Sequence, residues 1–208
     1  MRKQEYEFFK EATIRICGSL DMEKALWNFL TYAGDFIPLD QITLNLFERD
    51  LGSIRVVAGA TRDGGEKLNV IFPLTPESRS ELAGDRLSRI RIVNRPEKDR
   101  VTREIIRRVT GNPDSSLLIM RLEIEDKRLG TIVLRCDGKD RYTEGHSRLL
   151  LLLNEPFSVA LSNFLRHEEV SKLKDILADD NRFLHRELRS LSGEVIIGQD
   201  FGLRPVME

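Results

Sequence analysis

Arginine is the residue type whose chemistry stands out in the centre of this 208-residue sequence. A guanidinium stays charged and presents its donors in a planar fork, so an inward-pointing arginine can hold a carboxylate or phosphate through two hydrogen bonds. The candidates lie after residue 76 and on the strands expected to face that segment: Arg79, Arg86, Arg89, Arg91, Arg121 and Arg135. One or two of them, turned inward, would form an anion site. Solvated surface arginines paired with nearby glutamates are the ordinary alternative and account for most of the set.

The cysteines and histidines give weaker indications of a functional site. Cys17 and Cys136 lie far apart and outside any CxxC pattern, which predicts a reducing, cytoplasmic compartment. Cys136, at the end of an expected strand, could act as a redox sensor, although a free cysteine is commonly a small core residue. His146, His167 and His185 lack metal-ligand spacing, so we expect solvated helix positions and no metal site.

Sequence patterns for catalysis are missing. No serine or cysteine stands in a nucleophile elbow, and no pair of acids has a spacing that singles it out for acid and base catalysis. A GxxxxGK[ST] run, whose amides and lysine would cradle phosphates, is absent as well. We therefore expect a protein that is not an enzyme and has no ATP site in these residues. A small redox enzyme that uses Cys136 is the catalytic alternative.

Charge and hydropathy argue against two kinds of partner. Lys and Arg number 33 against 34 Asp and Glu, so no net field draws the chain to nucleic acid or to an anionic membrane. The longest apolar run, 149–153, is far shorter than a membrane span, and the N-terminus has no signal-peptide core. With 40% hydrophobic and 32% charged residues, the sequence predicts one globular domain with an appendage.

Hydrophobic periodicity predicts helices first and strands afterwards. Apolar residues at helical spacing define a helix over 6–16 and a second helix from Asp21 to before Pro38. Period-two alternation bounded by turn residues predicts five strands. These strands cover 41–47, 53–60, 68–74, 116–125 and 129–136, the last two joined by the turn 126–128.

The segment 76–112 breaks this regularity into short pieces, among them the run Arg89–Val93 and a helix over 102–109. The order of elements predicts an α+β fold with a central antiparallel sheet of about five to six strands. Helices cover one face of that sheet and an irregular cover lies on the other. We expect a pocket between the sheet and this cover.

Alternation along 116–125 assigns its side chains to the two faces of the sheet. If Leu118, Met120, Leu122 and Ile124 face the helices, then Ile119 and Arg121 face the pocket, and Arg121 is the best single candidate for contact with a ligand. Two apolar residues near the end of the third strand would add a wall to the pocket, or would simply belong to the core. The expected ligand-binding residues are Phe72, Leu74, Arg79, Arg91, Ile119, Arg121 and Arg135.

A long helix follows, capped by Thr143, kinked at Pro156 and continuing to about Ser190. Its distal half carries apolar residues at alternating three- and four-residue spacing, interrupted by two acids, which favours a parallel homodimer through a coiled coil. The seam residues are Val170, Leu173, Leu177, Leu184 and Leu191, with Asp180 and Glu187 as the interruptions. Ile176 and Phe183 fit a shifted register, and an amphipathic helix packed on another domain fits nearly as well.

Over residues 1–166 this order of elements, with the hairpin 118–134, resembles the GAF family of sensory domains. The tail, with Ile196-Ile197-Gly198 followed by Val206-Met207, resembles the entry to the AAA+ module of sigma-54-type activators. The resemblance implies a sensory domain at 1–166, a signalling helix at 167–190 and the start of a truncated AAA+ module at 191–208. The rest of the AAA+ module and a DNA-binding module of the same protein would then be its partners.

Together these resemblances imply the regulatory input domain of a bacterial transcription activator, which binds a small effector and controls an ATPase through a dimeric helix. The effector would be a cyclic nucleotide, a small anion, a metal or a gas. Two other interpretations stay open: a ligand-free dimerisation or interaction module, whose pocket its own side chains fill, and the sensory domain of a different signalling protein.

Overall fold

In the described part of the chain, six strands form one antiparallel sheet in the order β3-β2-β1-β6-β5-β4. The computed structural model describes residues 3–48, 50–83, 88–109, 114–125 and 127–191. The chain divides into two units, 1–164 and 165–208, and the sheet belongs to the first. The strands are β1 (Gln41–Glu48), β2 (Ser53–Thr61), β3 (Gly64–Pro73), β4 (Ile90–Val93), β5 (Ser115–Ile124) and β6 (Lys127–Asp137). The predicted α+β class is confirmed.

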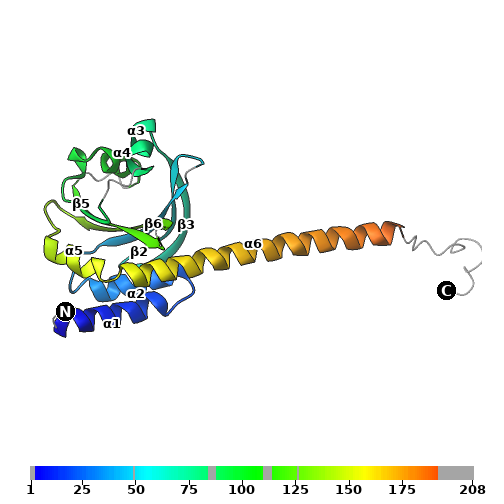
Figure 1. Ribbon diagram of the computed structural model, residues 1–208, viewed down its shortest axis with the longest axis horizontal. Coiled ribbons are helices and arrows are strands. Elements are labelled where there is room, and N and C mark those ends of the chain that lie inside the picture. Colours follow the sequence, from blue (N-terminus) through cyan, green and yellow to red (C-terminus); the bar gives the residue numbers. More distant parts are fainter. Residues whose placement is uncertain (1–2, 49, 84–87, 110–113, 126, 192–208) are drawn as a thin grey trace, which may run out of the picture. The chain divides into compact units, whose positions relative to one another are not determined.

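One face of the sheet is covered by α1 (Lys3–Cys17), α2 (Met22–Ala33), α5 (Glu144–Leu151) and the first turns of α6 (Asn154–Leu191), as Figure 1 shows. Strand side chains on this face are fully buried, among them Leu118, Met120 and Leu122 of β5. Phe29 of α2 meets Phe157 of α6 edge to face, with ring centroids 5.1 Å apart. Burial of each such side chain contributes roughly 1.5–3 kcal/mol, so this layer is the main core.

The opposite face is covered by shorter elements. Figure 1 shows α3 (Pro76–Ala83) and α4 (Arg100–Val109) there, and the 3-10 helix η1 (Pro96–Lys98) comes just before α4 in the chain. The run Arg89–Val93, expected to be one of several irregular pieces, instead supplies the edge strand β4. Ile90 pairs with Met120 and Val93 with Leu117. The irregular cover is therefore anchored to the sheet through a sixth strand.

Close approach of two backbones explains Gly130 in β6. A Cβ atom at this position would lie 2.6 Å from the carbonyl oxygen of Asn45 in β1. Such a contact is sterically excluded, so only glycine allows β1 and β6 to pair here. A bulge between Leu122 and Glu123 interrupts the alternation of β5, and Ile124 beyond it is only half-buried.

Two local predictions were wrong. The long helix is not kinked at Pro156. It ends at Leu151, and α6 begins at Asn154, so that Pro156 occupies a first turn, where its missing N–H costs no helical bond. The turn expected over 126–128 lies earlier, because Lys127 and Arg128 already belong to β6 and Glu125 takes a φ of 48°. Asp126 lies outside the described residues.

Thr143 does cap α5, as predicted. Its Oγ1 accepts a hydrogen bond from the His146 N–H at 3.4 Å, and His146 Nδ1 accepts one from the Thr143 N–H at 3.3 Å. Asp21 precedes α2 at the N-cap position, but its side chain makes no capping hydrogen bond. The reciprocal pair at Thr143 therefore fixes the entry to α5 on both sides.

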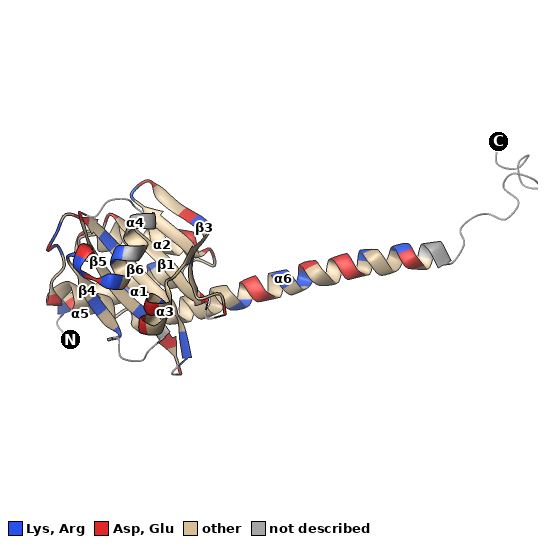
Figure 2. Cartoon of the chain, turned by 90° about the horizontal axis from the view of Figure 1, so that it is seen from above, with Lys and Arg blue, Asp and Glu red and all other residues tan. Residues whose placement is uncertain are grey.

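In the second unit, α6 continues to Leu191 with charges of both signs along its length (Figure 2). The predicted seam residues Val170, Leu173, Leu177 and Leu184 are exposed. The residues of the shifted register, Ile176 and Phe183, are exposed as well. Of Leu191 only its place in the helix is described, and the stretch 192–208 with the AAA+ resemblance lies outside the described residues. No described helix has the length and apolar character to cross a membrane.

Candidate ligand cavity

A cavity of about 140 Å³ lies between the sheet and its cover, which α3 and α4 form. All six strands contribute side chains to its floor, and these point away from the layer of α1, α2, α5 and α6; residues of α3 and α4 form its cover. The residues on the two sides of β5 differ in role. Leu118 and Met120 are buried under the helices, whereas Ile119 and Arg121 line the cavity.

Most of the cavity wall is apolar. Leu117 and Ile106 line the cavity and form, with Val93 of β4, a small hydrophobic cluster that joins the sheet to α4; Ile119 and Val133 pack against this cluster. The β2–β3 side adds Ile54, Val56 and Phe72, while Val101 and Ile105 of α4 and Leu82 of α3 complete the cover. A ligand body in this cavity would mainly meet hydrocarbon.

Arginines gather at one end of the cavity. The Arg121 N–H donates to the Arg89 carbonyl at 2.8 Å, which places these residues opposite each other on β5 and the start of β4. Glu123 is in ion-pair contact with Arg121 and lies 3.6 Å from Arg89, measured from its Oε2 to Arg89 Nη2. The buried Arg121 Nε is the atom that contacts the Glu123 carboxylate. Two guanidinium groups thus share one carboxylate.

The other cavity arginines have partners of their own. Arg91 forms an ion pair with Asp99. Arg135 donates from Nε to Gln41 Oε1 at 2.9 Å and from Nη1 to Asp137 Oδ1 at 2.6 Å.

On β6, Arg128 is cross-strand to Glu123. Its Nη1 donates to the backbone carbonyl of Leu82, and its guanidinium lies 5.8 Å from the centre of the Phe47 ring. The Arg128 side chain therefore links α3, which forms part of the cover, to strand β6 of the sheet.

Comparison with known proteins identifies the fold. No known family model matches the sequence. The formate hydrogenlyase transcriptional activator FhlA of Escherichia coli (strain K12) is 30% identical over 101 residues, which is 47% of this chain and 14% of that protein. The GAF domain of the Acinetobacter phosphoenolpyruvate-protein phosphotransferase aligns with a TM-score of 0.57 at 14% identity, covering 81% of this chain and 99% of that domain. The chain has the GAF fold.

The same fold is also used by an enzyme. Free methionine-R-sulfoxide reductase from Neisseria meningitidis, in complex with its substrate, aligns with a TM-score of 0.55 at 8% identity, over 80% of this chain and 95% of that protein. The fold alone therefore does not separate a sensor from a catalyst.

Five of the residues predicted for the site line the cavity of this GAF fold: Phe72, Arg91, Ile119, Arg121 and Arg135. Leu74 and Arg79 are not among the described lining residues. The chain leaves the sheet after Pro73, and Leu74 is buried with its N–H bonded to the Gly52 carbonyl at 3.1 Å. The Arg79 Nε donates to the Leu74 carbonyl at 2.9 Å, so this arginine stabilises the turn into α3. Arg86 lies outside the described residues.

Sequence reasoning missed several polar lining residues, including Thr43, Asn45, Arg128 and Thr131. A signal for some of them existed. In β6, Thr131, Val133 and Arg135 alternate with buried Ile132, Leu134 and Cys136, as Ile119 and Arg121 do in β5. The same period-two argument, applied to 129–136, would have placed Thr131 and Val133 on the cavity side.

The cavity is connected by hydrogen bonds to the beginning of α6. Asn154 Nδ2 donates to the Arg121 carbonyl at 2.7 Å, and Ser158 Oγ accepts from the Glu123 N–H at 3.2 Å. Asn154 is 7% exposed and Ser158 is 1% exposed. The backbone groups of Arg121 and Glu123, whose side chains form the ion pair at the cavity, are therefore hydrogen-bonded to side chains of α6.

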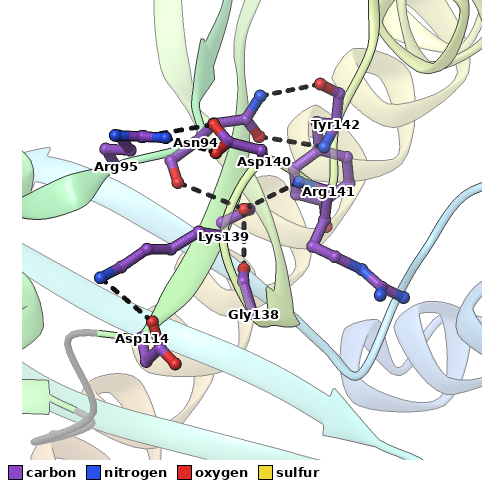
Figure 3. A network of polar contacts seen from close by, with 9 residues as sticks. Asn94, Arg95, Asp114, Gly138, Lys139, Asp140, Arg141 and Tyr142 are labelled. Carbon is purple, nitrogen blue, oxygen red and sulfur yellow. Dashed lines mark hydrogen bonds and ion pairs between the residues drawn. The ribbon is translucent and has the colours of Figure 1, made fainter.

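A second network fastens the end of β4 to the entry of α5 (Figure 3). The Asn94 side chain donates to the Tyr142 carbonyl at 2.9 Å and accepts from the Tyr142 N–H at 3.0 Å. Ser116 Oγ donates to the Gly138 carbonyl at 2.8 Å, and Arg95 pairs with Asp140 at 2.7 Å. A displacement of β4 would therefore displace Tyr142 and the start of α5 through these hydrogen bonds.

Cys136 lies on the helix-facing side of β6 and is buried. Burial, with a hydrogen bond to Asp40, raises the pKa of its thiol, which disfavours the reactive thiolate. Cys17 is exposed on α1, and partial desolvation raises its pKa too. Neither cysteine lines the cavity. The described residues contain no group of three His, Cys, Asp or Glu side chains placed to hold a metal ion.

Proposed function

We propose that this chain is a small-molecule-sensing input domain of a transcriptional activator of the sigma-54 type, acting in the cytoplasm and without catalytic activity of its own. One observation carries the proposal. Arg121 presents its side chain to the cavity, while its backbone carbonyl is bound by Asn154, the first residue of α6. A ligand at Arg121 would thus meet the residue that is attached to the output helix.

The proposal divides the chain into a sensory domain over 1–166, a signalling helix over 167–190 and the beginning of an AAA+ module over 191–208. The 30% identity to the E. coli activator, although limited to 14% of that protein, supports the same assignment. The AAA+ and DNA-binding modules would act on the signal, and the exposed seam of α6 would pair with that of a second copy.

Signalling requires a difference in affinity. A ligand shifts the equilibrium between two helix arrangements only if it binds one of them more tightly. The parts that would move are the cover, formed by α3 and α4, and the helix α6. Ion pairing at Glu123 and the hydrogen bond from its N–H to Ser158 connect a change at the cavity to α6.

The catalytic alternative rests on the fold shared with the sulfoxide reductase. The described lining of this cavity includes threonines, one serine, asparagine, glutamine and arginines, but no cysteine. Cys136 faces the helical layer, on the other side of β6. A thiol-based reaction on a ligand in this cavity therefore has no nucleophile within the described residues.

The test is a thermal-shift screen of the whole chain against a metabolite library, repeated with Ile119→Trp, which fills the cavity. A true cavity ligand at 100 times its Kd stabilises by about 2.7 kcal/mol, and Ile119→Trp removes this effect. Hydrogen exchange in residues 165–188 should change on binding in the parent chain and not in Asn154→Ala, which still binds. If no ligand stabilises the chain, the interaction-module alternative replaces the sensor.

A further inference from the structure

We propose that the ligand is a small monocarboxylic acid with a compact apolar body, bound as its anion with the carboxylate at Arg121 and Arg89. This inference rests on the proposed sensing function and adds the chemical class of the effector. It follows from three properties of the cavity, namely its size, its charge and the composition of its wall.

Size limits the ligand to about six to ten non-hydrogen atoms, because a cavity of about 140 Å³ compares with the engineered 150 Å³ cavity that accepts benzene. A nucleotide, with base, ribose and phosphate, is several times larger than benzene and does not fit this space. An ion of three or four atoms, such as formate or acetate, would leave most of the apolar wall without contacts.

Charge at the arginine end is unbalanced. Arg89 and Arg121 both lie at Glu123, so two guanidinium groups share one carboxylate. Arg121 on β5 lies opposite Arg89, the residue before β4, and the single charge of Glu123 offsets only one of these two like charges. A ligand carboxylate beside Glu123 would accept from both guanidinium groups and reduce this repulsion.

The remaining arginines do not compete for this anion. Arg91 is neutralised by Asp99, and Arg135 is held by Gln41 and Asp137. At the other end, the buried Arg121 Nε contacts Glu123, and Arg121 shares this carboxylate with Arg89. The polarity of the site is therefore fixed, with the carboxylate toward Arg121 and the body toward Arg91.

The apolar residues of the cavity wall favour a ligand with an apolar body. Beyond Arg121, the floor continues as Ile119 and Val133, and Ile106 of α4 lies above them. A phenyl ring or a branched chain would bury its hydrocarbon there at about 25 cal/mol per Å². A phosphate ester carries up to two charges into the same apolar surroundings, and its larger desolvation cost favours the carboxylate.

Titration calorimetry on the whole chain tests this class with benzoate and 3-methylbutanoate as probes. The comparison ligands are benzamide, which keeps the shape and lacks the charge, phenyl phosphate, which changes the anion, and acetate, which lacks the body. We expect benzoate or 3-methylbutanoate to bind at least tenfold more tightly than each comparison ligand.

Substitutions of the arginines test where the ligand carboxylate binds. Arg121→Gln and Arg89→Gln should each weaken benzoate binding at least tenfold and leave benzamide unchanged, whereas Arg148→Gln, on the exposed side of α5, should change neither. Arg89 is largely exposed, so Arg89→Gln provides the test if Arg121→Gln does not fold. Equal binding of benzoate and benzamide, or preference for acetate or phenyl phosphate, would overturn the inference.

The outcomes separate this inference from the proposed function. If a neutral or cationic molecule binds and Ile119→Trp blocks it, the sensing function stands and the carboxylate class is wrong. If neither the probes nor the library stabilise the chain, both fail together.

Discussion

Asn154 Nδ2 lies 2.7 Å from the backbone carbonyl oxygen of Arg121, and this hydrogen bond joins the first residue of α6 to the strand that lines the cavity. Because Asn154 is 7% exposed, its removal leaves the Arg121 carbonyl without this donor in a buried place. Asn154→Ala should lower the free energy of unfolding by about 1–3 kcal/mol. Urea denaturation measures the change. Asn163→Ala, an exposed position of the same helix, is the matched control and should stay within about 0.5 kcal/mol of the parent. Equal stability of both variants would contradict the role of Asn154.

The division of β5 between two faces could be read from the sequence because it depends only on local geometry. Leu118 and Met120 alternate with Ile119 and Arg121, and a strand directs successive side chains to opposite sides. The alternation of side chains predicts nothing for residues beyond the end of a strand. Leu74 was expected in the cavity because the third strand was extended by one residue past Pro73, where the chain in fact turns toward α3.

The partners of the arginines could not be predicted. Arg121 and Glu123 are two residues apart on one strand, which suggests an ion pair, but the approach of Arg89 depends on the pairing of β4 with β5. Likewise, the bond from Arg79 to the Leu74 carbonyl depends on the turn between β3 and α3. Sequence periodicity gives the face of an element, whereas these contacts depend on how distant elements meet.

Gly130 provides a prediction about the sheet itself. A Cβ atom at this position would meet the Asn45 carbonyl oxygen at 2.6 Å, and backbone atoms cannot move aside as a flexible side chain could. Gly130→Ala should therefore lower the melting temperature, corresponding to a loss of about 1–3 kcal/mol. Gly145→Ala serves as the control, because its Cβ would lie 3.5 Å from Thr143 Oγ1 in an ordinary contact within α5. This control should raise stability by up to about 1 kcal/mol. A neutral Gly130→Ala would show that β1 and β6 can separate freely.

His146 makes stability depend on pH. Burial lowers the pKa of its imidazole, and Nδ1 accepts the hydrogen bond from the Thr143 N–H, which requires an unprotonated nitrogen. As the pH falls below about 6.5, the unfolded chain binds a proton that the folded chain resists, so stability decreases. Glutamine at this position completes a capping box and does not titrate. The stability of His146→Gln, measured by urea denaturation at several pH values, should fall less between pH 7 and pH 5 than that of the parent. An identical slope in both proteins would rule out this contribution of His146.

The exposed seam of α6 gives the last prediction, which concerns self-association. Leu173, Leu177 and Leu184 are 53%, 61% and 54% exposed, and burial against a second copy would remove this apolar surface from water. We expect the whole chain to be a dimer in sedimentation experiments, and the double variant Leu177→Glu, Leu184→Glu to raise its dissociation constant at least a hundredfold, or about 2.7 kcal/mol.

Glutamate and leucine have similar helix propensities, so a loss of the dimer in this variant would not result from a loss of helix. The matched double variant Ile176→Glu, Phe183→Glu distinguishes the registers. It should weaken the dimer less than the seam variant if Leu177 and Leu184 lie at the centre of the interface, and more if the shifted register forms. A parent chain that stays monomeric at high micromolar concentration would refute pairing through α6. Those apolar residues would then be free to pack against another domain of the same protein.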